Sequence, residues 1–220
     1  MITISIAGEM KQRVSELKLS CIVSDVAVTP ENDDLWDKMQ VKIGTLSAQM
    51  KVGEISKLPA VSDSRKAYKA CGKDPARYRL SAEALLRRVL KQQELYQVNN
   101  VVDLLNWVSI SKGYSIGGYD ADKIEGNIEL GIGKENELYR GIGRGRLNIA
   151  NLPVFRDDKG AFGSPTSDSV RTAVTAQTKR FLMIIIEFGA SGKLGEATQM
   201  AIELLEKYAD ARNMETKTIR

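Results

Sequence analysis

Closely spaced aspartates are the side chains of this sequence best suited to acid–base chemistry. Asp120 and Asp122 are separated by one residue, and Asp157 and Asp158 are adjacent. Carboxylates at such spacing can bind a cation or act as general acid and general base. Aspartate is also common in turns and helix caps, because its short side chain accepts hydrogen bonds from nearby backbone N–H groups. The spacing alone therefore favours turn and cap roles.

The 220-residue sequence contains no histidine, which narrows the chemistry further. Histidine is the commonest general base and belongs to the Ser-His-Asp and Cys-His arrangements and to most zinc sites. An enzyme built from this chain has to use carboxylates, hydroxyls, lysine or backbone groups. We therefore predict neither a metal site nor a cofactor.

Two glycine-rich segments resemble phosphate-binding loops. Residues 141–145 (GIGRG) lack the third glycine of the dinucleotide fingerprint and precede a strand-like stretch, so a β-bulge is favoured. Residues 189–193 (GASGK) follow a buried strand and precede a helix, as a Walker loop does. Glu187 replaces the first glycine of that motif and Leu194 replaces the Mg²⁺-binding hydroxyl. We expect a flexible connection there, and anion binding at the following helix N-terminus stays open.

Positive charge is concentrated between Arg65 and Lys91. This segment holds nine basic and two acidic residues, whereas the whole chain has a net charge of only +4. Tyr68 and Tyr78 lie among the bases, a combination that suits phosphate contacts and base stacking. The alternative is two helices with solvated cationic faces. The candidate RNA-binding residues are Arg77, Arg79, Arg87, Arg88 and Lys91.

The apolar pattern predicts an α+β fold with mixed or antiparallel sheets and packed helices, in a single domain over residues 1–220. Residues 1–62 should form an N-terminal elaboration of strands and a helix, and residues 187–220 a C-terminal helix with a frayed end from residue 214. The expected strands are 2–6, 17–28, 128–132, 147–149, 153–155 and 181–188, and the expected helices are 30–50, 64–72, 81–91, 100–113 and 196–208.

The sequence gives no sign of secretion or of a membrane. Cys21 and Cys71 are too few for a disulfide framework. The longest apolar run, 181–186, is far shorter than the roughly 18 residues of a membrane span. The first residues contain a glycine, an acid and two bases, so they are not typical of a secretory signal. A reducing cytoplasm is the expected location.

Two motifs downstream of the basic segment carry more information together than either does alone. Residues 99–103 form the string NNVVD, with Asn106 close behind, and residues 117–124 form GGYDADKI. A basic helix, here Ser81–Lys91, precedes them, and residues 157–168 form a turn and a glycine-containing loop. This arrangement resembles the B3/B4 domain of the phenylalanyl-tRNA synthetase beta chain. The resemblance covers about residues 63–186.

The resemblance implies a site between two stretches of the chain, residues 117–120 and the glycine-containing loop at residues 163–168. In the family, the domain inspects the aminoacylated end of the tRNA and hydrolyses tyrosine wrongly attached to phenylalanine tRNA. The family histidine falls on Gly117, and the nearest acid to the family glutamate is Asp168. We therefore take Asp120 and Asp168 as catalytic candidates. The substrate-binding candidates are Gly117, Gly118, Tyr119, Gly163, Ser164 and Ser167.

Two functions follow as hypotheses. The first is a freestanding, tRNA-associated domain that hydrolyses misacylated aminoacyl-tRNA, without complete synthetase activity. The second is a non-catalytic module that binds RNA or an amino acid and has lost the editing chemistry. A small-molecule enzyme on the same fold also stays open. All site assignments require that the stretches 117–120 and 163–168 converge on one cavity.

Overall fold

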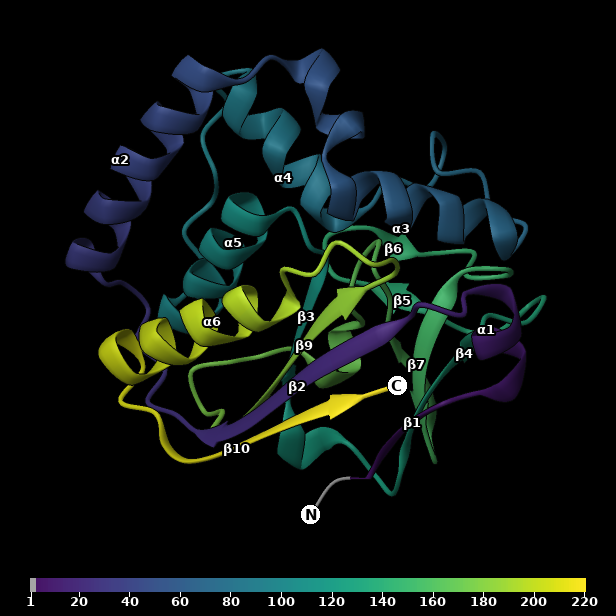
Figure 1. Ribbon diagram of the computed structural model, residues 1–220. Coiled ribbons are helices and arrows are strands. Elements are labelled where there is room, and N and C mark those ends of the chain that lie inside the picture. The colour runs from purple at the N-terminus through teal and green to yellow at the C-terminus, as the bar shows by residue number, and fades with distance from the viewer. Residues whose placement is uncertain (1–2) are drawn as a thin grey trace.

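Two four-stranded sheets form the centre of the computed structural model, which describes residues 3–220 (Figure 1). The first sheet has the strand order β1-β4-β7-β8, with β1 and β4 parallel and the other pairs antiparallel. The second has the order β10-β2-β9-β3 and is antiparallel throughout. A short hairpin joins β5 to β6. The strands are β1 (Ile4–Ile6), β2 (Lys18–Asp25), β3 (Ile116–Asp120), β4 (Ile128–Ile132), β5 (Arg140–Gly141), β6 (Gly145–Arg146), β7 (Pro153–Asp157), β8 (Gly160–Gly163), β9 (Arg180–Glu187) and β10 (Arg212–Ile219).

Helices cover the outer face of the second sheet and one end of the molecule. In Figure 1, α5 and α6 lie side by side against this sheet, and α2 and α4 form a further layer outside α5. The α-helices are α1 (Gly8–Arg13), α2 (Asp33–Gln49), α3 (Pro59–Ala70), α4 (Ser81–Leu90), α5 (Asn100–Lys112) and α6 (Leu194–Tyr208), and the 3₁₀ helices are η1 (Val52–Lys57), η2 (Ala121–Lys123) and η3 (Val170–Thr172). The predicted α+β class is thus confirmed.

The hydrophobic core follows from the sequence of β9, which is apolar on both faces. Leu182, Ile184 and Ile186 point into the layer between the two sheets. Phe181 and Met183 alternate with them and pack under α5 and α6. Because successive side chains of a strand point to opposite faces, an apolar run of this length is typical of a strand buried on both sides.

Three expectations about secondary structure are wrong. The C-terminal residues are not frayed, because β10 pairs with β2 from Arg212 to Ile219. Residues 147–149 form no strand: the pairing with β5 ends after the hydrogen bond from the Leu147 N–H to the Tyr139 carbonyl, and the Asn148 carbonyl accepts from the Lys73 ammonium. Residues 141–145 form the turn of the β5–β6 hairpin in place of a bulge, with Gly143 and Gly145 both at φ +67°.

The N-terminal third is built into both sheets. β1 pairs with β4, and β2 lies between β9 and β10. α3 begins at Pro59, so the boundary expected at residue 62 falls inside a helix. Residues 1 and 2, part of the first expected strand, lie outside the described residues. Cys21 and Cys71 are both free and buried. No helix within residues 3–220 has the length and apolar character needed to cross a membrane.

Candidate functional site

The two stretches that should form the site meet through Tyr119 and Asp168. Tyr119 lies on β3, and its hydroxyl donates a hydrogen bond of 2.8 Å to Asp168 Oδ1. The Gly118 N–H lies 3.4 Å from Asp168 Oδ2. Asp168 itself lies in the loop after β8, which belongs to the other sheet. The structure therefore brings stretches about fifty residues apart in the sequence to one place.

The space between these stretches is filled by the ring of Tyr119. The ring is fully buried and packs edge-on against Phe162, with ring centroids 5.0 Å apart. A Cβ atom added at Gly117 or at Gly163 would overlap the Tyr119 hydroxyl. Glycine at both positions therefore makes room for the tyrosine. A larger side chain at position 117 does not fit beside Tyr119.

Asp168 is the carboxyl group of this site whose protonation changes near neutral pH. Burial raises the pKa of Asp168 from 3.8 to about 7, against the hydrogen bonds from Tyr119 and Gly118, which lower it. Burial, followed by the charge of Asp168, raises the pKa of the Tyr119 hydroxyl well above its usual value. A carboxyl group with a pKa near the working pH is suited to general acid–base chemistry.

The loop that carries Asp168 is fixed by side chains from distant elements. The hydroxyl of Tyr68 on α3 lies 2.8 Å from Thr166 Oγ1. The hydroxyl of Tyr139 donates a 2.6 Å hydrogen bond to the Ser167 carbonyl. Both tyrosines are buried, and burial raises the pKa of each hydroxyl, so both stay protonated. These contacts hold the loop in one position relative to α3 and β5.

The two predicted serines mainly shape the loop. Ser164 Oγ donates to the Ser167 carbonyl at 2.9 Å and accepts from the Ser167 N–H at 3.2 Å. This pattern closes a turn and leaves little of the Ser164 hydroxyl for a ligand. The Ser167 hydroxyl has only two 3.5 Å contacts with carbonyl oxygens and remains partly exposed.

Asp120 has a structural role. Its Oδ2 accepts a 2.8 Å hydrogen bond from the Thr178 hydroxyl and lies 3.2 Å from the Lys123 ammonium. Its Oδ1 accepts from the Asp122 N–H and so caps η2. Because both oxygens are engaged, this carboxylate holds the end of β3. The cap role favoured by the aspartate spacing is confirmed here.

Asp157 of the second aspartate pair also has local partners. It forms a 2.7 Å ion pair with Arg171 and accepts from the N–H groups of Glu125 and Lys159. Although burial acts in the opposite direction, these partners lower the pKa of Asp157. Among residues 3–220, no group of three or more His, Cys, Asp or Glu side chains is placed to hold a metal ion.

The NNVVD string that carried the resemblance forms a structural joint. The Asn99 side chain caps α5 by accepting from the Val102 N–H at 2.9 Å. The Asn100 amide donates to the carbonyls of Ala27 and Tyr208. Burial raises the pKa of Asp103 to about 6. The string therefore fixes α5 against α6 and β2, and no hydrogen bond in the described structure joins it to Asp168.

Two of the predicted RNA-binding arginines, Arg87 and Arg88, are half-buried and engaged by other residues of the protein. Arg87 and Arg65 bind opposite oxygens of the buried Glu83, at 3.1 and 2.8 Å. Arg88 donates to the Glu94 carbonyl at 2.7 Å and lies over the ring of Tyr96.

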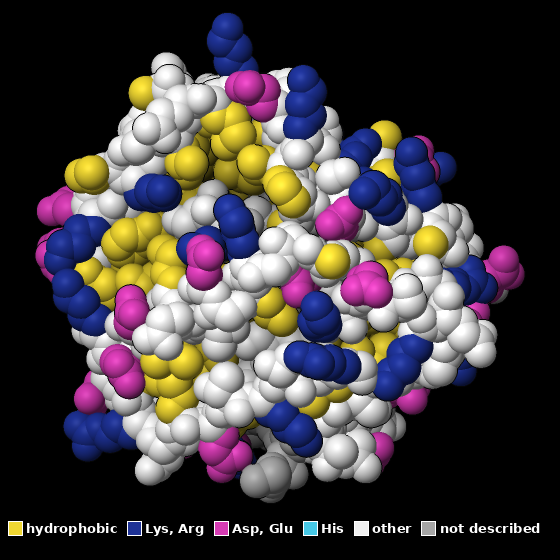
Figure 2. Space-filling model, in the orientation of Figure 1, with side chains coloured by type: hydrophobic (Ala, Val, Ile, Leu, Met, Phe, Trp, Pro, Cys, Tyr) yellow, Lys and Arg dark blue, Asp and Glu magenta, His cyan; other side chains and the backbone are white. Residues whose placement is uncertain are grey.

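The other three predicted RNA-binding residues are exposed. They are Arg77, Arg79 and Lys91, and no ion pair of theirs occurs in the part of the chain that the structure describes. In Figure 2, Lys and Arg side chains gather over the region where α3 lies in Figure 1.

The β5–β6 hairpin presents a cationic group that the sequence analysis missed. Arg140 and Arg146 are directly opposite each other in the ladder, and Arg144 lies in the turn between them. All three are exposed, and none forms an ion pair with another described residue. The signal was three arginines within seven residues, but the glycines of this segment drew the interpretation towards a nucleotide loop or a bulge.

This hairpin lies directly on the Asp168 loop. The Ile142 N–H donates a 2.9 Å hydrogen bond to the Asp168 carbonyl, and Gly141 forms a bridge with Ser169. A hollow of about 730 Å³ opens beside it. The polar residues around that hollow include Glu137, Tyr139, Arg140, Arg146, Lys159, Ser169 and Arg171. The cationic group and the Asp168 loop therefore form one continuous region.

Comparison with known proteins agrees with the resemblance drawn from the motifs. The family model described as B3/4 domain matches residues 63–214. The phenylalanine--tRNA ligase beta subunit of Fusobacterium nucleatum is 23% identical over 137 residues, which cover 61% of this chain and 17% of that protein. This chain thus spans about a sixth of the length of that relative. Among solved structures, an N-terminal fragment of the phenylalanyl-tRNA synthetase beta subunit from Pyrococcus horikoshii aligns with a TM-score of 0.48 and 12% identity, over 99% of this chain and 50% of that one.

Proposed function

Because this chain belongs to the B3/4 domain family, we propose that it binds the aminoacylated end of a tRNA with the β5–β6 hairpin and the adjoining Asp168 loop. The observation that carries this proposal is the pair of arginines, Arg140 and Arg146, placed opposite each other without acidic partners among the described residues. The relative from F. nucleatum is named as a ligase of phenylalanine and tRNA, which supports tRNA as the nucleic acid.

The arrangement of the hairpin favours an anionic ligand. Like charges directly opposite in a β-ladder repel each other and destabilise the pair. A phosphate group bound between two guanidinium groups removes that repulsion and accepts hydrogen bonds from both. Arg144 in the turn adds a third cation at the same surface. A nucleic-acid backbone supplies phosphates at the regular spacing that such a group can follow.

The hollow beside the hairpin is suited to the end of the nucleic acid. Its volume of about 730 Å³ falls within the usual range of ligand pockets. Tyr139, the first residues of β8 (Gly160 and Ala161) and Arg171 line it, and Arg171 is held by its ion pair with Asp157. We infer that the terminal nucleoside enters this hollow while the hairpin holds the preceding phosphates.

A second candidate function is hydrolysis of the aminoacyl ester, favoured by Asp168. The pKa of its carboxyl is raised to about 7, so it can take a proton from a water that attacks the ester carbonyl. That proton then passes to the ribose oxygen as the ester bond breaks, releasing the free amino acid. The buried Tyr119 ring argues for binding without hydrolysis, because it occupies the space between the two glycine stretches.

Binding of tRNA by charge-matched variants tests the first proposal. The triple variant R140Q/R144Q/R146Q should bind tRNA at least ~10-fold more weakly in fluorescence anisotropy than the parent chain. A control with the same loss of charge, K42Q/K57Q/K217Q, removes lysines from α2, η1 and β10. Its tRNA affinity should stay within about threefold of the parent value. Equal losses in both triples would overturn the assignment of the hairpin.

Deacylation assays separate the two candidate functions. Release of tyrosine from mischarged phenylalanine tRNA above the buffer rate, lost in Asp168→Asn, supports the hydrolase. Tight binding with no release at high protein concentration supports the non-catalytic module.

A further inference from the structure

A second cavity lies far from the hairpin, between α2 and α5. Figure 2 shows it as a hollow walled by hydrophobic side chains, with Lys and acidic side chains at its lower rim. Its volume is about 230 Å³. The apolar wall consists of Leu46, Met50, Leu58, Pro59, Ala60 and Ile110. The cavity is therefore smaller than a drug-sized site and mostly apolar on one side.

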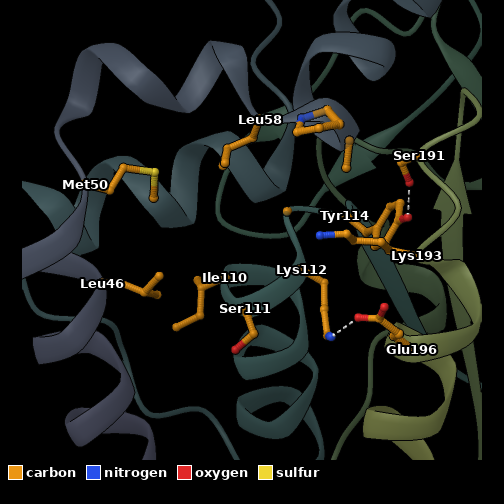
Figure 3. Close-up of a pocket in the computed structure, with 13 residues that line it drawn as sticks. Leu46, Met50, Leu58, Ile110, Ser111, Lys112, Tyr114, Ser191, Lys193 and Glu196 are labelled. Carbon is orange, nitrogen blue, oxygen red and sulfur yellow. Dashed lines mark hydrogen bonds and ion pairs between the residues drawn. The ribbon is translucent and has the colours of Figure 1, made fainter.

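The opposite side of this cavity is cationic. Lys112 and Lys193 both line it, together with Glu196 (Figure 3). Lys112 forms a 2.9 Å ion pair with Glu196, so these two charges cancel. Lys193 forms no ion pair with any other residue of the described range, and Figure 3 shows its side chain extending into the cavity. One positive charge is left uncompensated next to an apolar wall.

The loop that carries Lys193 is held in place by a buried acid. The hydroxyls of Tyr114 and Ser191 donate to Glu187 Oε1 at 2.9 and 2.7 Å, and the two hydroxyls contact each other. The Lys18 ammonium lies 3.8 Å from the other oxygen of Glu187. These hydrogen bonds hold Ser191, in the middle of the glycine-rich segment 189–193, beside the cavity.

Ser111 is a second polar residue of the cavity lining without a partner among residues 3–220. Its Oγ is buried and forms no hydrogen bond within residues 3–220. A buried hydroxyl without a partner is costly, so such groups often mark a place where a ligand or water binds. It lies on the turn of α5 that also carries Lys112, one residue away.

We propose that this cavity binds a small monocarboxylate, with its carboxylate at Lys193 and its apolar body against Leu46, Met50 and Ile110. A carboxylate matches the single unpaired ammonium, whereas a phosphate would need more donors than this rim offers. A cavity of about 230 Å³ lies below the usual size of a site for a drug-sized ligand, so it suits a short alkyl chain better than a larger body. This site is separate from the hairpin and does not depend on the tRNA proposal.

Isothermal titration with octanoate, 1-octanol and octylamine tests the proposal on the full chain. Octanoate should bind saturably and at least ~10-fold more tightly than 1-octanol, with octylamine weakest. Lys193→Gln should weaken octanoate binding by about tenfold and leave the affinity for 1-octanol unchanged. The control Lys207→Gln, an exposed lysine at the other end of the same helix, should change nothing.

Two results would overturn the carboxylate site. One is the absence of saturable octanoate binding at concentrations up to ~100 mM, which is about 100 times a millimolar Kd. The other is equal affinity for octanoate and 1-octanol with no effect of Lys193→Gln, which would leave a merely apolar hollow. The tRNA affinity of Lys193→Gln should stay unchanged, so failure of the carboxylate site is distinct from failure of the tRNA proposal.

Discussion

The Tyr119 hydroxyl donates a 2.8 Å hydrogen bond to Asp168, and this bond joins the two sheets at the candidate site. Tyr119 comes from β3 of the second sheet, and Asp168 follows β8 of the first. The bond fixes the carboxyl group beside the cationic hairpin. The geometry of the whole region therefore depends on Tyr119, for which the glycines at positions 117 and 163 leave room.

Removing only this hydroxyl should weaken the joint between the sheets. Tyr119→Phe keeps the ring packing against Phe155 and Phe162 but takes away a donor to the half-buried carboxyl of Asp168. We expect a loss of about 1–2 kcal/mol in the free energy of unfolding measured with urea. The pKa of Asp168 should rise further, because this bond favours the charged form. Unchanged stability together with an unchanged pKa in carboxyl NMR would contradict this role.

Asp168 should make stability depend on pH in a direction opposite to that of most carboxylates. Its pKa is about 7 in the folded protein, above the ordinary value of 3.8, so the folded state holds the proton more tightly. The stabilisation is fully present below about pH 4 and is lost as the pH rises to about 7. Urea unfolding should show the parent chain losing stability relative to Asp168→Asn between about pH 4 and about pH 7. A relative stability that instead increases with pH would show that the carboxyl is charged throughout.

The space next to Tyr119 should tolerate no added methyl group. Gly117→Ala places a Cβ on the Tyr119 hydroxyl and should cost about 2 kcal/mol through overpacking. Gly44→Ala in α2 is the control, because a Cβ there meets nothing within 4 Å and alanine favours a helix. Thermal unfolding of both variants checks this. Combining Gly117→Ala with Tyr119→Phe should cost somewhat less than the sum of the two single changes, since the hydroxyl makes the closest of the clashing contacts and the remaining ones are with ring carbons.

Arg87 should matter for stability more than for RNA affinity. It shares the buried Glu83 with Arg65, so Glu83→Gln leaves two partly exposed guanidinium groups without their acid and should cost about 2 kcal/mol. Glu196→Gln breaks an exposed ion pair with Lys112 and should change stability little. Arg87→Gln should lower tRNA affinity less than the hairpin triple variant does. If Arg87→Gln binds tRNA more weakly than the hairpin triple variant does, the main RNA contact lies on α4 and not on the hairpin.

Local patterns predicted those parts of the fold that local interactions determine. The Asn99 cap and the glycine at position 113, with φ +78°, bound α5 close to where the sequence placed it. The continuous apolar run of β9 predicted a strand buried on both faces. In both cases the residues that specify the element lie within it or next to it.

The features that were missed depend on contacts between distant segments. β10 has few apolar residues, and its strand form comes from backbone hydrogen bonds to β2, which no periodicity within 212–219 reveals. The sequence placed Tyr119 and Asp168 on converging stretches, but it did not show that the tyrosine ring fills the space between them. Likewise, only the tertiary structure shows that Arg65 of α3 reaches Glu83, whereas Arg87 lies one turn away from Glu83 in the same helix.

The salt dependence of tRNA binding tests the central claim most directly. If the β5–β6 hairpin holds phosphates, a plot of log affinity against log salt concentration should be shallower for R140Q/R144Q/R146Q by about two units or more, because each phosphate contact contributes roughly 0.7–0.9. The K42Q/K57Q/K217Q control should keep the parent slope. Identical slopes for the parent chain and the hairpin variant would contradict the account.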